Sequence, residues 1–380
     1  MGRRIVAVLG GGMSPEHEVS LKSAGEVLRH LDRERWLGWP VLLDREQAIW
    51  SIPNAPPEAL LDAPFDPGGW AQVESGRPGA ILSRLQDRGV EVVWPALHGP
   101  FGEDGTVQGM LNLHQLPFVG SGTAASAVAI DKLRTWQALT AQGLPMAKAH
   151  LGPEPLDQLR PAQAAVEAVA AVGLPCFLKI ATSGSTLGVA RATSVEEVEA
   201  FLLHHGDRSQ GWLAEAEVLG EEISVPVLES PDGVPEALPP VGIYPRGGGW
   251  FTHDAKYRAG GFDEALPPRG LSGAQSRQVQ VLAVACHEAL GGAALSRTDM
   301  IVTADGPVIL ELNSLPGMTP KSLLPKAAAA AGIYFQQLLS RLLLRAMDIA
   351  DTPSAQGARP FVLPTADPAR RRPAHSEEGK

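Results

Sequence analysis

Alternation of short apolar runs with helical patterns is the feature of the first part of the chain that most limits its fold. Each run is rich in Val, Leu or Ile, and a helical pattern or a loop follows it. Such repetition predicts an open parallel sheet, with ligands at the carboxyl ends of its strands. The expected strands are RIVAVLG (4–10), WPVLLD (39–44) and VEVVWPALHG (90–99), the expected helices cover 18–31 and 104–116, and residues 51–80 are predicted to be a loop or insertion.

The loop LGGGMSPEHEVSL (9–21) follows the first expected strand. Ser14 and Pro15 are typical of an N-cap and a first helical residue, so we expect strand, loop and helix in succession. The third glycine of a dinucleotide-binding loop is missing, and Glu16 and Glu18 would repel a phosphate. We therefore disfavour a dehydrogenase and expect Glu18 to suit a cation, such as a substrate ammonium group.

Composition limits the class of protein. The 380 residues suffice for two or three domains, and the formal net charge of −10 argues against a nucleic-acid partner. Cys176 and Cys286 lie in apolar surroundings, as expected of buried, reduced thiols. The sequence shows no secretory signal and no apolar run long enough to cross a membrane, so we expect a soluble, cytoplasmic protein without a membrane partner.

The rest of the chain predicts further α/β structure. One or two helices are expected in 121–143 and another in 333–347. A mostly antiparallel sheet with helical inserts is expected in 222–312. The Pro-rich tail from Asp351 is expected to be disordered. Three more strands, at 175–180, 188–192 and 212–220, are predicted around the loop ATSGSTLG (181–188).

A hairpin is predicted in LSRTDMIVTADGPVILELNS (295–314), with its turn at 304–306. Glu311 and Asn313 share one face of the second strand, and pairing can bring Asp299 to the same face. Three hard oxygen donors in an apolar setting are typical of a Mg²⁺ site that leaves positions for phosphates. The alternative is three polar residues on a half-exposed hairpin.

Lys179 ends an apolar strand just before the loop 181–188. Backbone N–H groups of such a loop can bind phosphate oxygens, although the order of residues differs from a P-loop. The alternative is a plain glycine-rich hairpin. Lys132, Lys256 and His98 are weak indications one by one. Together with the acidic hairpin, these residues predict ATP chemistry without a P-loop.

At this point the chain resembles the D-alanine–D-alanine ligase family of the ATP-grasp superfamily. The resemblance rests on seven segments in the family's order, spanning roughly residues 5–345: GGMSPEHEVSL, PALHGPFGEDGTVQGML, GSGTAASAVAIDK, LKIATSGSTLGV, DAKYR, SRTDM and ELNSLPGMTPKSLLP. It implies a three-domain α/β ATP-grasp architecture: an N-terminal open parallel-sheet substrate domain (1–125), a central ATP-grasp subdomain (126–214), a C-terminal ATP-grasp and metal-binding domain (215–348) and a disordered tail (349–380).

The resemblance also implies roles for individual residues. Glu18 would hold the ammonium group of the first D-alanine, with Ser185 and Tyr257 as hydrogen-bonding partners and His98 nearby. Arg297 and the Gly317 N–H would stabilise the tetrahedral intermediate, while Ser322 and Leu323 would cap the second carboxylate. For the nucleotide, the resemblance implies phosphate contacts from Lys132, Lys179, Lys256 and Ser185, and a ribose contact from Glu222. Adenine would be bound by Glu215 or the neighbouring Glu217 and by the backbone of Ala216 and Val218. Two Mg²⁺ ions, with Mn²⁺ as an alternative, would be held by Asp299, Glu311 and Asn313.

The activity that the resemblance implies is ATP-dependent joining of two D-alanines through a D-alanyl phosphate, for peptidoglycan precursors, in a cytoplasmic homodimer. Lys321 precedes Ser322, so the second substrate stays open between D-alanine and D-serine or D-lactate. Tyr257 favours the dipeptide over the ester. A non-catalytic nucleotide-binding module is the alternative from another class, and the joint presence of the acids, Arg297 and the lysines argues against it.

Overall fold

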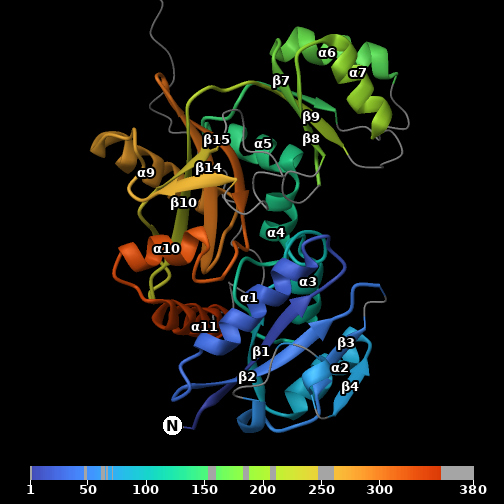
Figure 1. The fold of residues 1–380 in the computed structure, drawn as a ribbon, viewed down its shortest axis with the longest axis vertical. Helices are drawn as coiled ribbons and strands as arrows, with labels where there is room; N and C mark the ends of the chain where they lie inside the picture. Colours follow the sequence, from blue (N-terminus) through green and yellow to red (C-terminus); the bar gives the residue numbers. More distant parts are fainter. Residues whose placement is uncertain are drawn as a thin grey trace, which may run out of the picture.

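The computed structural model describes residues 2–46, 49–60, 65, 67–70, 72–152, 160–182, 188–205, 211–246 and 261–351. Its strands form three sheets, each with helices packed against it (Figure 1). The sheets follow one another along the chain, as the predicted α/β organisation requires. The predicted disordered tail falls almost wholly outside the described residues.

The first sheet has the strand order β4-β3-β2-β1-β5. Its centre is parallel, as predicted, because β1 (Arg4–Gly11) pairs in parallel with both β2 (Trp36–Leu43) and β5 (Val90–Pro95). The expected loop at 51–80 is wrong in part: β3 (Trp50–Pro53) and β4 (Val73–Gly76) extend the sheet in antiparallel fashion. Both strands have only four residues and β4 is largely exposed, so neither produces an apolar run in the sequence.

Five helices follow the strands of this first part: α1 (His17–His30), α2 (Pro78–Asp87), α3 (Thr106–Leu113), α4 (Thr123–Ile130) and α5 (Lys132–Ala141). The predicted N-cap of α1 is wrong by two residues. Ser14 Oγ accepts a hydrogen bond from the N–H of Glu16 at 3.1 Å, and Glu16 is the residue that precedes the helix. The serine thus closes a turn before the helix and leaves Glu16 at its start.

The second sheet is antiparallel, with the order β6-β9-β7-β8. Its strands are β6 (Ala149–Gly152), β7 (Cys176–Ile180), β8 (Val189–Ala192) and β9 (Trp212–Ala216). Two helices, α6 (Pro161–Val172) and α7 (Val195–His204), cover one face (Figure 1). Their apolar side chains share a core with Leu178 and Trp212, which leaves the other face of the sheet for a ligand.

The third sheet contains the predicted hairpin. Its path is β13-β12-β10-β14-β15, with β11 beside β10. The strands are β10 (Glu221–Glu229), β11 (Pro235–Ala237), β12 (Val241–Pro245), β13 (Phe262–Ala265), β14 (Leu295–Thr303) and β15 (Gly306–Asn313). Helix α9 (Gly273–Ala289) packs against it and begins with a capping box between Ser272 and Gln275. Gly306, at φ 128°, makes the tight turn between β14 and β15.

The last two described helices share an apolar core with the first sheet. Helix α10 (Leu323–Ala330) was not expected, and α11 (Phe335–Asp351) confirms the helix predicted at 333–347. Leu338 and Leu342 of α11 share one core with Val6 and Trp36 of the first sheet, and α11 lies beside α1 in Figure 1. No helix in the described ranges is both long and apolar enough to span a membrane.

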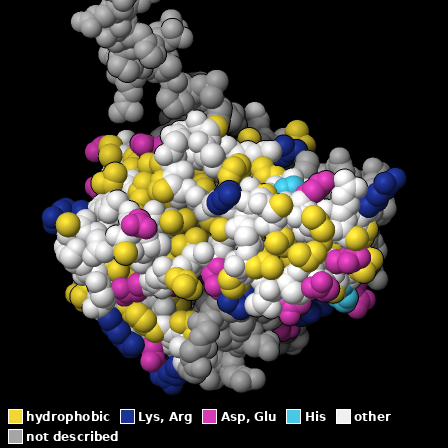
Figure 2. Space-filling view, turned by 90° about the horizontal axis from the view of Figure 1, so that it is seen from above, with side chains coloured by type: hydrophobic (Ala, Val, Ile, Leu, Met, Phe, Trp, Pro, Cys, Tyr) yellow, Lys and Arg dark blue, Asp and Glu magenta, His cyan; other side chains and the backbone are white. Residues whose placement is uncertain are grey.

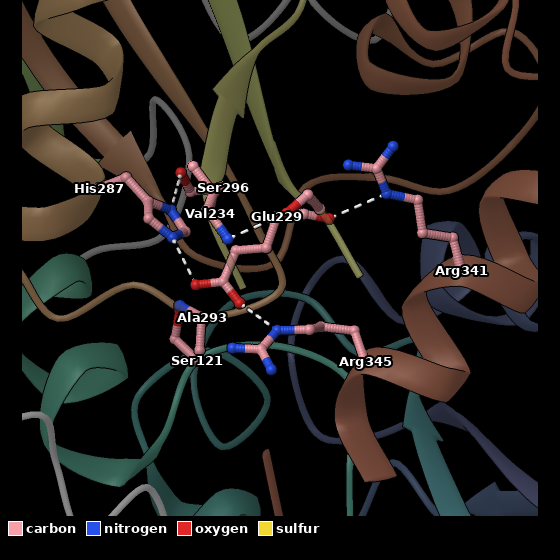
Figure 3. Close-up of polar contacts among 9 residues, drawn as sticks. Ser121, Glu229, Val234, His287, Ala293, Ser296, Arg341 and Arg345 are labelled. Carbon is pink, nitrogen blue, oxygen red and sulfur yellow. Dashed lines mark hydrogen bonds and ion pairs between the residues drawn. The ribbon is translucent and has the colours of Figure 1, made fainter. Parts of the chain in front are cut away.

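A buried polar cluster also holds α11 in place (Figure 3). Glu229 Oε2 accepts a hydrogen bond from Arg345 Nε at 2.7 Å, and Glu229 Oε1 lies 3.6 Å from His287 Nε2. The other ring nitrogen of His287 is 2.8 Å from Ser296 Oγ. Burial opposes the charge of Glu229, but the contact with His287 and the hydrogen bond from Arg345 outweigh burial and lower its pKa. The cluster therefore keeps a carboxylate charged inside the core.

Basic side chains are scattered over one face of the molecule, and the predicted absence of a nucleic-acid partner stays a prediction. On the face drawn in Figure 2, the described Lys and Arg side chains lie apart from one another, among hydrophobic and acidic ones. The formal net charge of the chain is −10. A scattered arrangement of this kind does not make the basic stripe that a phosphate backbone binds.

Candidate functional site

A cavity of about 430 Å³ lies between the second and third sheets. The second sheet contributes Lys179 and Glu215, and the third contributes Asp299 and Glu311. The start of α5 adds Lys132. Helix α1, the loop after β5 and the residues around the start of α10 complete the wall. Two sheets and segments next to the first sheet therefore line one cavity.

Most of the predicted site residues line this cavity. The set that the structure brings together is His98, Lys132, Lys179, Glu215, Ala216, Val218, Glu222, Arg297, Asp299, Glu311, Asn313, Gly317, Ser322 and Leu323. These residues come from segments far apart in the sequence. Ser185, Lys256 and Tyr257, also predicted, lie outside the described residues.

The predicted metal ligands share one face of the β14–β15 hairpin. Asp299 is directly opposite Glu311 in the register, and Arg297 is opposite Asn313. Arg297 donates two hydrogen bonds to Asp299, at 2.9 Å from Nε to Oδ1 and 2.7 Å from Nη2 to Oδ2. Ser224 Oγ donates a third, at 2.5 Å to Oδ1. The Asp299 carboxylate is thus fixed in orientation before any ligand binds.

Charge in this corner fits a divalent cation. Burial and, to a smaller extent, the nearby Asp299 and Glu311 carboxylates raise the pKa of Glu222 to about 8. The Asp299 and Glu311 carboxylates thus disfavour a further negative charge on Glu222, and a cation is favoured at such a place. In the part of the chain that the structure describes, no group of three His, Cys, Asp or Glu side chains forms a ready-made metal site. The predicted set has two carboxylates and an amide, so substrate oxygens would have to complete the shell.

Arg297 stays positively charged in spite of its surroundings. Burial opposes the charge, but the Asp299 carboxylate outweighs burial and raises the pKa of Arg297 above its ordinary value. Its side chain is only 13% exposed. A guanidinium of this kind can stabilise a negative charge that develops in the cavity.

Two lysines face the same space with different environments. Burial lowers the pKa of Lys132, and the neighbouring Lys179 adds to that effect, whereas Glu311 opposes it. Lys179 forms an ion pair with Glu215, and both side chains are largely buried. Lys179, predicted to bind a phosphate, and Glu215, a candidate for contact with adenine, are therefore partners in one ion pair. The pair joins the neighbouring strands β7 and β9.

Glu215 and Glu217, the two candidates for contact with adenine, have different surroundings. Glu215 lines the cavity, whereas Glu217 accepts hydrogen bonds from Arg191 at 2.6 and 3.2 Å. The hydrogen bond from Arg191 lowers the pKa of Glu217. The sequence left open which of the two glutamates faces adenine. In the structure, Glu215 is the one that lines the cavity.

Glu18 is the predicted residue that the structure leaves outside. Its side chain is 70% exposed and forms an ion pair with Arg45, at 3.0 Å from Oε1 to Nη2. Glu16 lines the cavity instead. His98 also lines it, and its Nε2 lies 3.2 Å from Ser23 Oγ of α1. The assignment of Glu18 to an ammonium group remains a prediction.

Several cavity residues were not singled out as site residues from the sequence. Glu103 follows His98 in the same loop, and its Oε2 accepts a hydrogen bond from the N–H of Gly99 at 2.6 Å. Glu264 and Phe262 of β13 also line the cavity, as does Lys321, which the sequence flagged beside the second-substrate site. An acid between glycines in HGPFGEDG was the available signal for Glu103. Phe262 and Glu264 reach the cavity through non-local pairing, which gives no local pattern.

Two family models match the chain. The model described as D-ala D-ala ligase N-terminus matches residues 5–121, and the one described as D-ala D-ala ligase C-terminus matches residues 138–344. The chain belongs to the D-alanine–D-alanine ligase family. Curated relatives named D-alanine–D-alanine ligase agree: one from Corynebacterium aurimucosum is 36% identical, over 90% of this chain and 97% of its own. Another from Nocardia farcinica is 38% identical, over 90% and 96%.

Solved structures of the ligase family show the same fold. The D-alanine–D-alanine ligase from Bacillus anthracis complexed with ATP has a TM-score of 0.70 at 24% identity, covering 91% of this chain and 98% of that one. The VanG D-Ala:D-Ser ligase from Enterococcus faecalis has a TM-score of 0.76 at 26% identity, covering 90% and 99%. The predicted ATP-grasp architecture is therefore confirmed.

Proposed function

We propose that the chain is an ATP-dependent ligase that joins two D-alanines into D-alanyl-D-alanine through a D-alanyl phosphate. The observation that carries the proposal is the cavity itself, which two lysines and an arginine share with acidic side chains. Its lining includes Lys132, Lys179, Arg297, Asp299 and Glu311. Cations and acids in one enclosed space suit a reaction that brings several anions together. Membership of the ligase family supports the same assignment.

In the first step, a carboxylate oxygen of D-alanine attacks the γ-phosphorus of ATP and the bond to the β–γ bridging oxygen breaks, giving ADP and the acyl phosphate. Lys132 and Lys179 offset the negative charge of the phosphates. Asp299, Glu311 and Asn313 would hold Mg²⁺, two ions in our proposal and with Mn²⁺ as an alternative. Bound there, the metal would polarise the phosphoryl oxygens.

In the second step, the amine of the second D-alanine attacks the acyl carbon, the bond from that carbon to the phosphate oxygen breaks, and the nitrogen loses a proton. Negative charge develops on the carbonyl oxygen, where Arg297 and the Gly317 N–H are proposed donors. Ser322 and Leu323, at the start of α10, are proposed to receive the second carboxylate. Both segments line the cavity.

The remaining assignments are also proposals. Glu18, Ser185 and Tyr257 would hold the first D-alanine, Lys256 a phosphate, Glu215, Ala216 and Val218 adenine, and Glu222 ribose. Domain boundaries at 125, 214 and 348, a homodimer, and a cytoplasmic role in peptidoglycan precursor synthesis complete the proposal. The first sheet ends before residue 126, which supports the boundary at 125, whereas the boundary at 214 falls within strand β9 of the second sheet, and the third sheet begins at Glu221.

The test is phosphate release by the purified protein with Mg²⁺–ATP. D-alanine, L-alanine, D-alanine plus D-serine and D-alanine plus D-lactate are compared, and products are identified by mass. Release that needs D-alanine and yields the dipeptide supports the proposal. A mixed product would shift the acceptor assignment toward the D-serine or D-lactate alternative. ATP binding without D-alanine-dependent turnover would favour the non-catalytic module.

A further inference from the structure

An ion pair joins strand β13 to helix α10 in the wall of the cavity. The Glu264 carboxylate and the Lys326 ammonium are in contact, with side chains 21% and 38% exposed. Glu264 lines the cavity together with Ser322 and Leu323. Neither Glu264 nor Lys326 has a role in the reaction as proposed above.

Lys326 is connected to Ser322 through the backbone. Its N–H donates to the Ser322 carbonyl oxygen at 3.1 Å, within the first turn of α10. The Ser322 hydroxyl is held in turn by the Thr319 N–H at 3.2 Å and lies 2.9 Å from Thr319 Oγ1. Fixing the Lys326 side chain on β13 therefore fixes the turn that carries Ser322.

Strand β13 needs such a contact because it is short and lies at the edge of its sheet. It has four residues, and among the strands that the structure describes it pairs with β12 alone. Its Phe262 packs in the same apolar cluster as Leu323 and Leu324 of α10. The ion pair adds a directional contact to this apolar one, and its geometry sets the distance between β13 and the start of α10.

Charge gives a second reason for the pair. The first turn of a helix presents its positive end, where a lysine is unfavourable and an anion is favoured. Glu264 offsets the Lys326 charge at that place. Without Glu264, the Lys326 charge would lose its partner and the start of α10 would lose its charged contact with β13.

We infer that Glu264 and Lys326 are a positioning pair that holds the first turn of α10 in register for the carboxylate of the second, acceptor amino acid. The inference rests on the proposed function. The residues act through Ser322 and Leu323 and do not touch the reacting atoms. Loss of the pair therefore affects acceptor binding and leaves ATP binding and donor binding in place.

The experiment measures separate Michaelis constants for the donor and the acceptor from phosphate release against D-alanine, together with the KM for ATP. Glu264→Gln and Lys326→Met should each raise the acceptor KM about three- to tenfold, the range for loss of a half-exposed ion pair in a binding wall. The donor KM and the ATP KM should change less than about twofold. The charge-swapped double variant, Glu264→Lys with Lys326→Glu, should recover most of the acceptor KM.

A matched control is Arg84→Met. Arg84 of α2 pairs with Glu74 of β4, another contact between a helix and an edge strand, and neither residue lines the cavity. This variant should leave all three constants unchanged. Thermal melting of each variant separates a folding defect from a positioning effect, because the swap would not rescue an acceptor KM lost through general destabilisation.

An unchanged acceptor KM in both single variants, or a rise in all constants that the swap does not reverse, would overturn the positioning role while the ligase activity stood. Absence of D-alanine-dependent phosphate release from the unaltered chain would instead overturn the proposed function, and the inference with it.

Discussion

Arg345 donates a 2.7 Å hydrogen bond to a Glu229 carboxylate that has no exposed side-chain area. Such a pair is costly to break, because the carboxylate that remains has no access to water. The register of the third sheet places Glu229 at the end of β10, and α11 brings Arg345 back to it across 116 positions of sequence.

Arg345→Met should therefore lower the free energy of unfolding by about 3 kcal/mol, the low end for a buried pair that loses one partner. Arg341→Met is the matched control: the same residue type on the same helix, bonded to the Glu229 backbone oxygen and to the exposed Glu236. Its effect should stay near 1 kcal/mol or below, as for a single hydrogen bond. Urea unfolding of both variants gives the comparison, and equal losses would contradict the buried-charge argument.

Glu311→Gln should abolish D-alanine-dependent phosphate release, with a loss of about a thousandfold or more in kcat, as when a principal charge in a phosphoryl-transfer site is removed. The shape of the side chain is retained, so folding should not change. Glu236→Gln on β11, outside the cavity, serves as the control. Near-normal turnover by the Glu311 variant would show that the hairpin is not the metal-binding element.

Chelation of divalent cations should stop turnover, and added Mg²⁺ or Mn²⁺ should restore it. The reason is the negative charge of Asp299 and Glu311, which disfavours the ionisation of Glu222 and which the phosphates of ATP would increase. Titration of the chelated protein with each metal, followed by phosphate release, gives the measurement. Turnover that persists after exhaustive chelation would contradict the assignment.

Arg45→Met should lower the KM for the donor D-alanine about two- to fourfold, the scale of an exposed ion pair. Arg45 holds the Glu18 carboxylate on the outside of the molecule, and a substrate ammonium group would have to replace it. Steady-state kinetics at low and high salt separates the competition from a folding effect, since salt should reduce the difference between the variant and the unaltered chain. A raised donor KM would remove Glu18 from the donor site.

Burial raises the pKa of Cys286 to about 12, and it raises the pKa of Cys176 as well. Both thiols should resist a disulfide-exchange reagent at pH 8 in the native protein and react in denaturant. Since the unfolded thiols ionise near pH 8.5 while the folded ones keep their protons, stability should fall as the pH rises above about 8.5. Fast native labelling would contradict the burial of both side chains.

The sequence predicted best what depends on neighbours in the chain. The β14–β15 hairpin follows from a turn and a two-residue alternation, so Asp299 and Glu311 could be expected on one face in advance. The parallel centre of the first sheet was predictable for the same reason. The directly opposed register of Asp299 and Glu311 was not predicted, because it depends on an irregularity in the pairing between Asp299 and Met300. Strand β4, with little burial, has no such pattern.

Contacts between segments far apart in the sequence could not be predicted from local sequence patterns. The Lys179–Glu215 ion pair depends on which strands are neighbours in the second sheet, and the exposed position of Glu18 depends on Arg45. The family resemblance supplied candidates for these roles, but only the packing shows which side chains reach the cavity. Ser185, Lys256 and Tyr257 lie beyond the described residues and keep their predicted roles as hypotheses.

The packing of α11 on the first sheet has a consequence for folding during synthesis. The strands of the first sheet are synthesised before α11, yet Trp36 contacts residues of that helix. Its indole nitrogen lies 3.3 Å from Ser340 Oγ, and its ring shares a core with the leucines of α11. Until that helix has been translated, part of an apolar face stays exposed to chaperones and to other nascent chains. We therefore expect the first sheet to finish folding only after α11 has been made.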